Sequence, residues 1–344
     1  MPTIKDVVRA SGVSAATVSY VLNNGPRSVR PETRERVLSA IRALGYRPSA
    51  IVRGPQAQYM RTLGVIFPHE CYSLSTNPYF ISILDGIMSA AEAKDQNTMI
   101  LTRRIFVDAR QSVRVHCDGH CDGLLLIAPP VNCPIVEALK ERAIPFVLIN
   151  ETSDDPEISC VDVDNAAAAE RLILYVLEHG HRRIALLHGD SQLGSVALRI
   201  AGYKRALEAQ NILYETMLIL PGKYEEESGY ERAHQVMRLR ARDRPTVLFC
   251  GNDRVALGAL RALRELGQKV PRDMSVVGFD DIASAATCNP PLTTIRQPLQ
   301  QLGERGVETL FAQIYEGAAP GHKELLATEL IIRNSVAPTP QRQN

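Results

Sequence analysis

The sequence predicts an α/β protein in which a small, all-helical N-terminal module precedes a two-lobed domain of doubly wound parallel sheets. Three observations predict this fold class. The first 47 residues carry only short helical patterns, whereas from Thr62 onward short apolar runs alternate with amphipathic stretches of helical length. The chain has 344 residues, enough for two or three domains, and its hydrophobic fraction of 45% suits globular cores.

The N-terminal module is predicted to contain three short helices. Thr3 and Asp6 have the spacing of a reciprocal cap for a first helix that runs to Gly12. Ser14 is placed to cap a second helix, AATVSYVLNN, and Pro31 suits the first turn of a third, PETRERVLSAIRALGY. The apolar residues with helical spacing are expected to form its core: Val18, Val21, Leu22, Val37, Leu38, Ile41 and Leu44.

The module combines a tight interhelical turn with a strong positive charge. The turn Ser11-Gly12-Val13 between the first two helices is typical of a helix-turn-helix. Residues 1–61 carry ten Lys and Arg against three acidic residues, a net charge of +7, whereas the remainder carries −6. A compact basic module on an acidic body indicates a polyanion binder. The alternative is an ordinary solvated basic surface.

The rest of the chain divides into a linker and alternating strands and helices. Residues 48–60 (PSAIVRGPQAQYM) form a plausible linker. The predicted strands are TLGVIF, TMILT, GLLLI, FVLI, IALLH, VLFC and SVVGF. The predicted helices are 79–94, 166–179, 196–210, 227–240 and 253–266. This alternation favours two parallel sheets with helices on both faces, and ligands bind such folds beyond the carboxyl ends of the strands.

Composition also bounds the location and chemistry of the protein. No apolar run approaches the ~20 residues that span a bilayer, and the N-terminus lacks the apolar core of a signal peptide. We therefore expect a cytoplasmic protein without a membrane partner. Seven cysteines without a secreted pattern favour reduced thiols that pack as small apolar side chains. Nothing in the sequence calls for a cofactor.

Many segments of the chain together resemble the lactose-repressor (LacI/GalR) family of transcription regulators. The resemblance begins with TIKDVVRASGVSAATVSYVLNN and TRERVLSAIRALGYRPS, and continues through NPYFISILDGI, DVDN, HGHRRIALLHG, RIAGYKRAL, CGNDRVALGALRALRELG, VPRDMSVVGFDD, PPLTTIRQP and ATELIIRNS. It implies a periplasmic-binding-protein-like sensor of two lobes, between which the chain crosses near residues 162, 293 and 325. The expected domains are a helix-turn-helix (1–47), a hinge or linker (48–61) and an effector-binding and dimerisation domain (62–344). Lobe 1 is expected at about 62–162 and 294–324, and lobe 2 at about 163–293 and 325–340.

The resemblance implies DNA contacts on the second helix of the module. Base edges would be met by Ala15, Ala16 and Tyr20, and phosphates by Ser14, Thr17, Ser19 and Asn23. The family often has arginine or histidine at the position of Tyr20, and a tyrosine cannot make the bidentate contact of arginine to guanine. We therefore expect an operator that differs from the commonest family site.

The hinge departs further from the family pattern. Family members fold this segment into a short helix on DNA and wedge a leucine into the minor groove, whereas this chain has Gly54-Pro55 after Arg53. Proline removes an N–H and disfavours helical geometry in the preceding residue. Because proline is also among the side chains that open a base step, both a wedge by Pro55 and the lack of a hinge helix remain open. Arg53 and Pro55 are kept as candidate DNA contacts.

In the sensor, family-matching residues converge on one cleft. They comprise polar groups for hydroxyls and aromatic faces for C–H surfaces, as a sugar-like effector requires: Tyr79, Phe80, Arg199, Tyr224, Asn252 and Asp280. Core packing is the alternative role of the three aromatic residues. Asp280 and Asp281 could also be paired catalytic carboxylates, but no nucleophile or acid–base constellation accompanies them, so we expect no enzyme.

The sequence therefore predicts a homodimeric repressor that binds double-stranded operator DNA under the control of a small effector. Two alternatives remain. His116, Cys117, His120 and Cys121 in HCDGHC are soft ligands for a metal- or thiol-responsive regulator, although zinc sites usually use two separated ligand pairs. A transport-type solute-binding protein would share the sensor fold, but it would need export and would not need the basic module.

Overall fold

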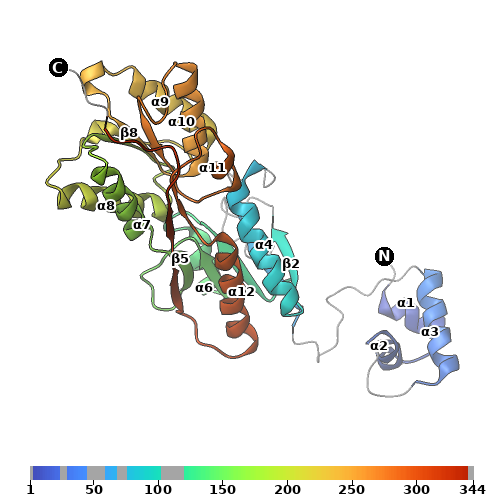
Figure 1. The fold of residues 1–344 in the computed structure, drawn as a ribbon. Helices are drawn as coiled ribbons and strands as arrows, with labels where there is room; N and C mark the ends of the chain where they lie inside the picture. Colours follow the sequence, from blue (N-terminus) through green and yellow to red (C-terminus); the bar gives the residue numbers. More distant parts are fainter. Residues whose placement is uncertain (1–2, 24–28, 45–58, 68–75, 102–119, 340–344) are drawn as a thin grey trace.

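A computed structural model describes residues 3–23, 29–44, 59–67, 76–101 and 120–339 (Figure 1). In the N-terminal module, α1 (Ile4–Ser11), α2 (Ala15–Asn23) and α3 (Pro31–Leu44) are the three predicted helices. They enclose a small core in which Val7, Val18 and Val37 are fully buried. The three-helix plan expected from the sequence is confirmed.

The helix ends of the module are closed by the residues that the sequence indicated. Asp6 accepts hydrogen bonds from the backbone N–H of Thr3 (2.8 Å) and from its hydroxyl (2.7 Å). Gly12 ends α1 with φ of +67°, a left-handed conformation that glycine adopts without steric cost. Ser14 Oγ accepts the N–H of Thr17 at 3.2 Å, which fixes the start of α2. Local chemistry therefore sets the angle between α1 and α2.

Lobe 1 is built on a parallel sheet. Its described strands lie in the order β11-β5-β4-β3-β1-β2. Their bounds are β1 Thr62–Ile66, β2 Asn97–Leu101, β3 Gly123–Ile127, β4 Phe146–Ile149, β5 Ser159–Val163 and β11 Lys323–Leu326. One face packs against α4 (Pro78–Ala93) and α12 (Leu299–Tyr315), and the other carries α6 (Pro134–Lys140). The all-apolar runs of β3 and β4 are buried on both faces, as parallel strands require.

Lobe 2 repeats the plan with a second parallel sheet. Its described strands lie in the order β7-β6-β8-β9. Their bounds are β6 Ile184–Leu187, β7 Ile219–Leu220, β8 Val247–Cys250 and β9 Ser275–Val277. The helices are α7 Asn165–Glu178, α8 Gly194–Ala209, α9 Glu226–Met237, α10 Asp253–Glu265 and α11 Ala283–Thr287, with 3-10 turns at Thr216–Leu218 and Ala241–Asp243. Figure 1 shows α7 with α8 and α9 with α10 as two helix pairs, one for each apolar cluster of this lobe.

Three segments of the described chain join the two lobes. The first crossing follows β5, which ends at Val163. The predicted boundary at 293–294 is too early, because β10 (Thr294–Arg296) bridges onto the lobe 2 segment after β9 and buries Ile295 in its core. The chain then enters α12, forms β11 in lobe 1 and returns through β12 (Glu329–Ile331), which pairs antiparallel with β10. Over residues 120–339 the chain thus crosses between the lobes three times.

Candidate effector cavity and DNA-reading face

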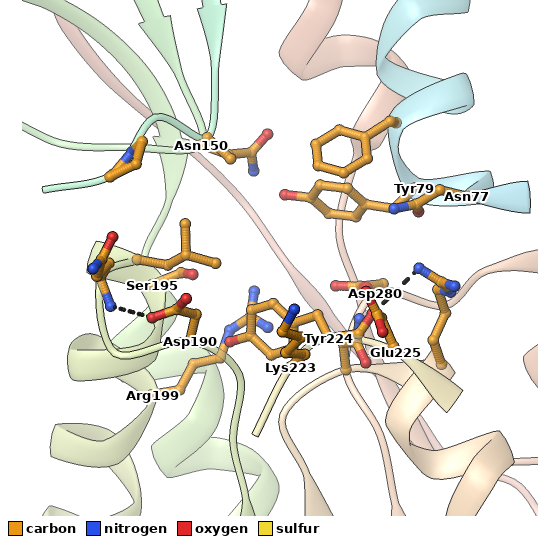
Figure 2. A pocket seen from close by; sticks show the side chains of 17 residues that line it. Asn77, Tyr79, Asn150, Asp190, Ser195, Arg199, Lys223, Tyr224, Glu225 and Asp280 are labelled. Carbon is orange, nitrogen blue, oxygen red and sulfur yellow. Dashed lines mark hydrogen bonds between the residues drawn. The ribbon is translucent and has the colours of Figure 1, made fainter. Parts of the chain in front are cut away.

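A cavity of about 330 Å³ lies between the two lobes, at the carboxyl ends of both sheets. Lobe 1 contributes the first turn of α4 and the loops after β3 and β4. Lobe 2 contributes the loops after β6, β7, β8 and β9 together with the first half of α8. Parallel sheets leave side chains and backbone groups free at this edge, where ligands of doubly wound folds bind. All six effector-binding residues predicted from the sequence line this one cavity. Figure 2 shows four of them, Tyr79, Arg199, Tyr224 and Asp280, with their side chains around it.

Arg199 forms the basic side of the cavity and is held from within lobe 2. It lies on α8, which approaches α7 closely because Gly202 leaves no side chain between them; a Cβ there would lie 2.1 Å from the carbonyl oxygen of Ala166. Arg199 Nε donates to Asn165 Oδ1 (2.9 Å), and its Nη1 donates to the carbonyl of Gly251 (2.5 Å). The guanidinium also lies over Phe279, 3.7 Å from the ring centroid. This buried cation is therefore fixed before any effector arrives.

Asp280 forms the acidic side of the cavity, on the turn after β9. Its φ of +124° is strained for a residue with a side chain, and the conformation is held by its backbone N–H, which donates to Ile295 at 2.8 Å. Gln297 Nε2 donates to Asp280 Oδ1 at 2.7 Å. Burial raises the pKa of Asp280 to about 7, although Arg199, Gln297 and Arg254 each favour the carboxylate. An effector that supplies a donor to this oxygen favours the ionised form.

Asn252 has a structural as well as a cavity-lining role. Its side-chain oxygen accepts the N–H of Val255 at 2.9 Å and so caps α10. The amide nitrogen is the part of Asn252 left for an effector. The neighbouring Asp253 is fully buried and accepts from the backbone of Ile282 (2.9 Å) and the hydroxyl of Thr294 (2.6 Å). Asp253 thereby joins the end of β8 to the turn that carries Asp280.

Each of the three aromatic residues lines the cavity and also packs against the core of its own lobe, so both roles considered from the sequence apply to all three. Tyr79 and Phe80 lie in the first turn of α4 and pack edge to face, with ring centroids 5.2 Å apart. Tyr224 follows β7 and packs against the lobe 2 core, with Arg199 5.6 Å from its ring centroid. Burial raises the pKa values of Tyr79 and Tyr224, so both hydroxyls stay neutral and remain able to donate a hydrogen bond.

The structure adds cavity residues that the sequence analysis missed. Asn77 precedes α4 and Asn150 follows β4, and the side-chain oxygens of both are buried without a hydrogen-bond partner. Unsatisfied buried acceptors of this kind cost free energy, so they mark where a ligand can donate. Asn77 stands in the NPYF segment, and Asn150 directly follows the strand FVLI. Both residues could therefore have been noticed in the sequence from their places beside a helix start and a strand end. The other added residues are Ala128, Pro130, Asp190, Gln192, Leu193, Ser195, Lys223, Glu225 and Arg254.

Asp281 does not form a catalytic pair with Asp280. Its carboxylate is paired with Arg296 and Arg333, each at 2.7 Å. Arg296 adjoins the segment that crosses back to lobe 1, and Arg333 follows β12. The carboxylate of Asp281 therefore ties the turn after β9 to the segments near the lobe crossings.

The described residues predicted to contact DNA lie on α2 and on the residue before it, Ser14. Ala15 and Ala16 are exposed, Tyr20 is half-buried, and Val18 and Val21 point into the core. Ser14 Oγ lies 2.9 Å from Thr17 Oγ1, so these two hydroxyls also bond to each other. Ser19 is half-buried. The basic residues on the outside of α1 and α3 are exposed: Lys5, Arg9, Arg34, Arg36 and Arg42.

Several predicted sites lie outside the described residues. These are Arg53, Pro55, the side chain of Asn23, and His116 and Cys117 of the HCDGHC segment. Within the described part of the chain, which includes His120 and Cys121, no group of three or more His, Cys, Asp or Glu side chains has the arrangement of a metal site.

A basic three-helix module and a two-lobed sensor with a polar cavity between its lobes define a ligand-responsive, DNA-binding transcription regulator. The chain belongs to the lacI family of bacterial regulatory proteins: the model of that family matches residues 3–49, and a periplasmic binding protein-like domain matches residues 173–336. It is 34% identical over 340 residues to the HTH-type transcriptional repressor PurR of Vibrio vulnificus (strain CMCP6), covering 98% of this chain and 99% of that protein.

Solved structures agree over nearly the whole chain. The lac repressor dimer bound to operator and the anti-inducer ONPF superposes with a TM-score of 0.76 at 28% identity, covering 98% of this chain and 99% of that one. The complex of the regulator CelR with cellobiose superposes with a TM-score of 0.74 at 28% identity, covering 97% and 100%.

These similarities show that the protein is a repressor that binds operator DNA and responds to a small effector. The protein is therefore neither an enzyme nor a transport-type solute-binding protein. Such a regulator acts in the cytoplasm, where bacterial DNA lies. Within the residues that the structure describes, none of the helices combines the length and apolar character needed to cross a membrane.

Proposed function

We propose that this repressor senses a sugar or sugar derivative in the cavity between its lobes. The observation that carries the proposal is the presence of a buried arginine, Arg199, and a buried carboxyl, Asp280, in one cavity with aromatic rings. Hydroxyl groups both donate and accept, so a polyol can satisfy Asp280 and the unpartnered oxygens of Asn77 and Asn150 while accepting from Arg199.

The ring surfaces suit the other half of a sugar. Tyr79, Phe80 and Tyr224 offer flat apolar faces to the C–H groups of a pyranose or furanose. The similarity to CelR, solved with cellobiose, supports the same ligand class. A flat nitrogen heterocycle is the competing class, because it too stacks on aromatic rings and bonds to an Arg–Asp pair.

On the DNA side, we propose that α2 reads the operator. Ala15, Ala16 and Tyr20 would meet base edges, while Ser14, Thr17, Ser19 and Asn23 would meet phosphates. Arg53 and Pro55 are kept as proposed contacts from the linker. The proposed domain limits are 1–47 for the DNA-binding domain, 48–61 for the linker and 62–344 for the sensor. We also propose a homodimer that binds two half-sites, as in the lac repressor dimer on its operator.

A thermal-shift screen followed by calorimetry tests the effector class. The panel contains pentoses, hexoses, disaccharides and phosphorylated sugars in one arm, and purine bases and nucleosides in the other. We expect stabilisation that grows with concentration in the sugar arm. Stabilisation only by bases or nucleosides would overturn the sugar proposal and leave the repressor assignment intact.

A further inference from the structure

Helix α8, which carries Arg199, begins without a cap of its own. The residue at its N-cap position is Leu193, whose side chain makes no capping hydrogen bond, and its first turn contains no acidic residue. The free N–H groups at a helix start require acceptors, and the positive end of the helix dipole favours an anion there. The start of α8 therefore needs a partner from outside the helix.

That partner comes from the opposite lobe. Glu151 lies two residues after β4 of lobe 1, and its Oε2 accepts the backbone N–H of Gly194, the first residue of α8, at 3.1 Å. Its Oε1 accepts the N–H of Thr152 at 3.2 Å. The side chain is 8% exposed, and burial raises the pKa of its carboxyl. A buried carboxyl of lobe 1 thus lies on the N-terminus of a lobe 2 helix.

The carboxyl of Glu151 lies so close to the start of α8 that the first residue of the helix must be glycine. A Cβ added to Gly194 would lie 2.3 Å from Oε1 of Glu151 and 2.7 Å from its Oε2. The three atoms nearest to that Cβ all belong to the Glu151 carboxyl group. Gly194 has no positive φ, so the glycine is needed for the approach of the carboxylate rather than for the backbone conformation.

A second hydrogen bond joins lobe 1 to the loop that precedes α8 in lobe 2. The backbone N–H of Val131, in the loop after β3 of lobe 1, donates to the carbonyl of Gln192 at 2.8 Å. Gln192 lies two residues before Gly194 in lobe 2. The loop before α8 is therefore bonded to lobe 1 at two places along one side of the effector cavity.

We propose that Glu151 is a positioning residue that caps α8 across the cleft and so holds the two lobes in their closed arrangement. By fixing the start of α8, it sets Arg199 against the lobe 1 residues of the cavity. Glu151 itself is not among the cavity-lining residues. The proposal goes beyond the effector assignment, because it concerns the equilibrium between lobe arrangements whatever molecule binds.

Hydrogen–deuterium exchange on the full-length protein tests the proposal without an effector. The reporter is the Val131 amide, which Glu151 does not touch. Pro129 and Pro130 carry no N–H, so a peptide over residues 127–133 contains few other amides. Glu151→Ala should speed exchange at Gly194 and, because the lobes separate, also at Val131, by roughly tenfold for a lost charge-assisted hydrogen bond. Glu151→Gln, which keeps an acceptor and loses the charge, should fall between.

A matched control has the same kind of cap within one lobe. Asp164 accepts the N–H of Ala167 at 2.8 Å and caps α7 inside lobe 2. Asp164→Ala should speed exchange in the first turn of α7 and leave Val131 unchanged. If Glu151→Ala likewise affects only its own helix start and leaves Val131 protected, Glu151 is a cap alone and the proposal fails.

A double-mutant cycle of Glu151 and Gly194 tests the proposal independently. Gly194→Ala should speed exchange at Val131 in the wild type, because the new methyl displaces the carboxyl. In the Glu151→Ala background the same substitution should add nothing further, since the colliding group is gone. Additive effects of the two substitutions on Val131 would overturn the proposal.

Discussion

Gln297, on the segment by which the chain returns from lobe 2 to lobe 1, donates a hydrogen bond of 2.7 Å to the carboxyl of Asp280 in the effector cavity. Its backbone N–H also donates to the carbonyl of Asp280 at 3.2 Å. A crossing segment is thus bonded twice to a residue of the cavity. We infer that a rearrangement of the lobes at this crossing would alter the surroundings of Asp280 and so link effector binding to lobe position.

Gln297→Ala should shift the pH dependence of effector binding. Gln297 favours the ionised form of Asp280, so its removal should raise the pKa of that carboxyl above its present value of about 7. At pH 7 a larger fraction is then protonated, and binding that uses the carboxylate should weaken several-fold and recover at higher pH. Calorimetric titrations between pH 6 and 9 measure this. A variant whose pH profile matches the wild type would show that Gln297 does not tune Asp280.

The stability of Asp162→Asn relative to the wild type should increase as the pH rises. Asp162 is buried at the first lobe crossing, and burial raises its pKa to about 7 from the ordinary 3.8. The folded state therefore keeps a proton that the unfolded chain has lost, so this carboxyl makes stability fall as pH rises from about 4 to 7. The limiting slope is about 1.4 kcal/mol per pH unit. Urea unfolding of both proteins at pH 5 and pH 8 checks the sign; equal differences at both pH values would contradict it.

Tyr20→Ala should relax the preference for one operator position, because a base contact specifies sequence. Asn23→Ala should instead weaken binding to all sequences similarly, as loss of a phosphate contact does. Selection of binding sites from a random pool with each variant distinguishes the two. If the base profile of the Tyr20 variant is unchanged, Tyr20 is not a reader.

Operator affinity should fall steeply with salt. The exposed Lys and Arg residues around α2 displace counterions when they meet phosphates, so the logarithm of the binding constant should decline linearly with that of the salt concentration. Fluorescence anisotropy between about 50 and 200 mM salt measures the slope. Substitution of Arg34 by alanine should make the slope shallower. A flat dependence would argue against phosphate contacts by this module.

How far the sequence could predict the site depends on the kind of signal. Arg199, Asn252 and Asp280 could be found because each follows a strand or lies on an amphipathic helix within a family segment. Asn77 and Asn150 were missed, since a single asparagine at a strand or helix end is common and only the fold shows its oxygen buried without a partner. Glu151 could not be found at all, because its partner, Gly194, belongs to another lobe.

The same distinction applies to the fold: local patterns could be predicted from the sequence, and contacts between distant segments could not. The alternation of apolar runs with amphipathic stretches predicted both parallel sheets, because that pattern depends on local burial. The boundary at 293–294 was placed too early, since Thr294–Arg296 is short and its lobe is decided by a bridge from Asp280 to Arg296. Short segments whose partners are distant in sequence carry no periodic signal of their own.

Operator binding by the wild type and by Asp280→Ala, with and without the effector found by screening, tests whether the cavity between the lobes controls DNA binding. We expect both proteins to bind operator equally well without effector, because the reading helix belongs to a separate domain. The effector should change the affinity of the wild type only, since loss of the Asp280 carboxyl should weaken effector binding several-fold to hundreds-fold. Full response to the effector by Asp280→Ala would contradict this and place the sensing site elsewhere.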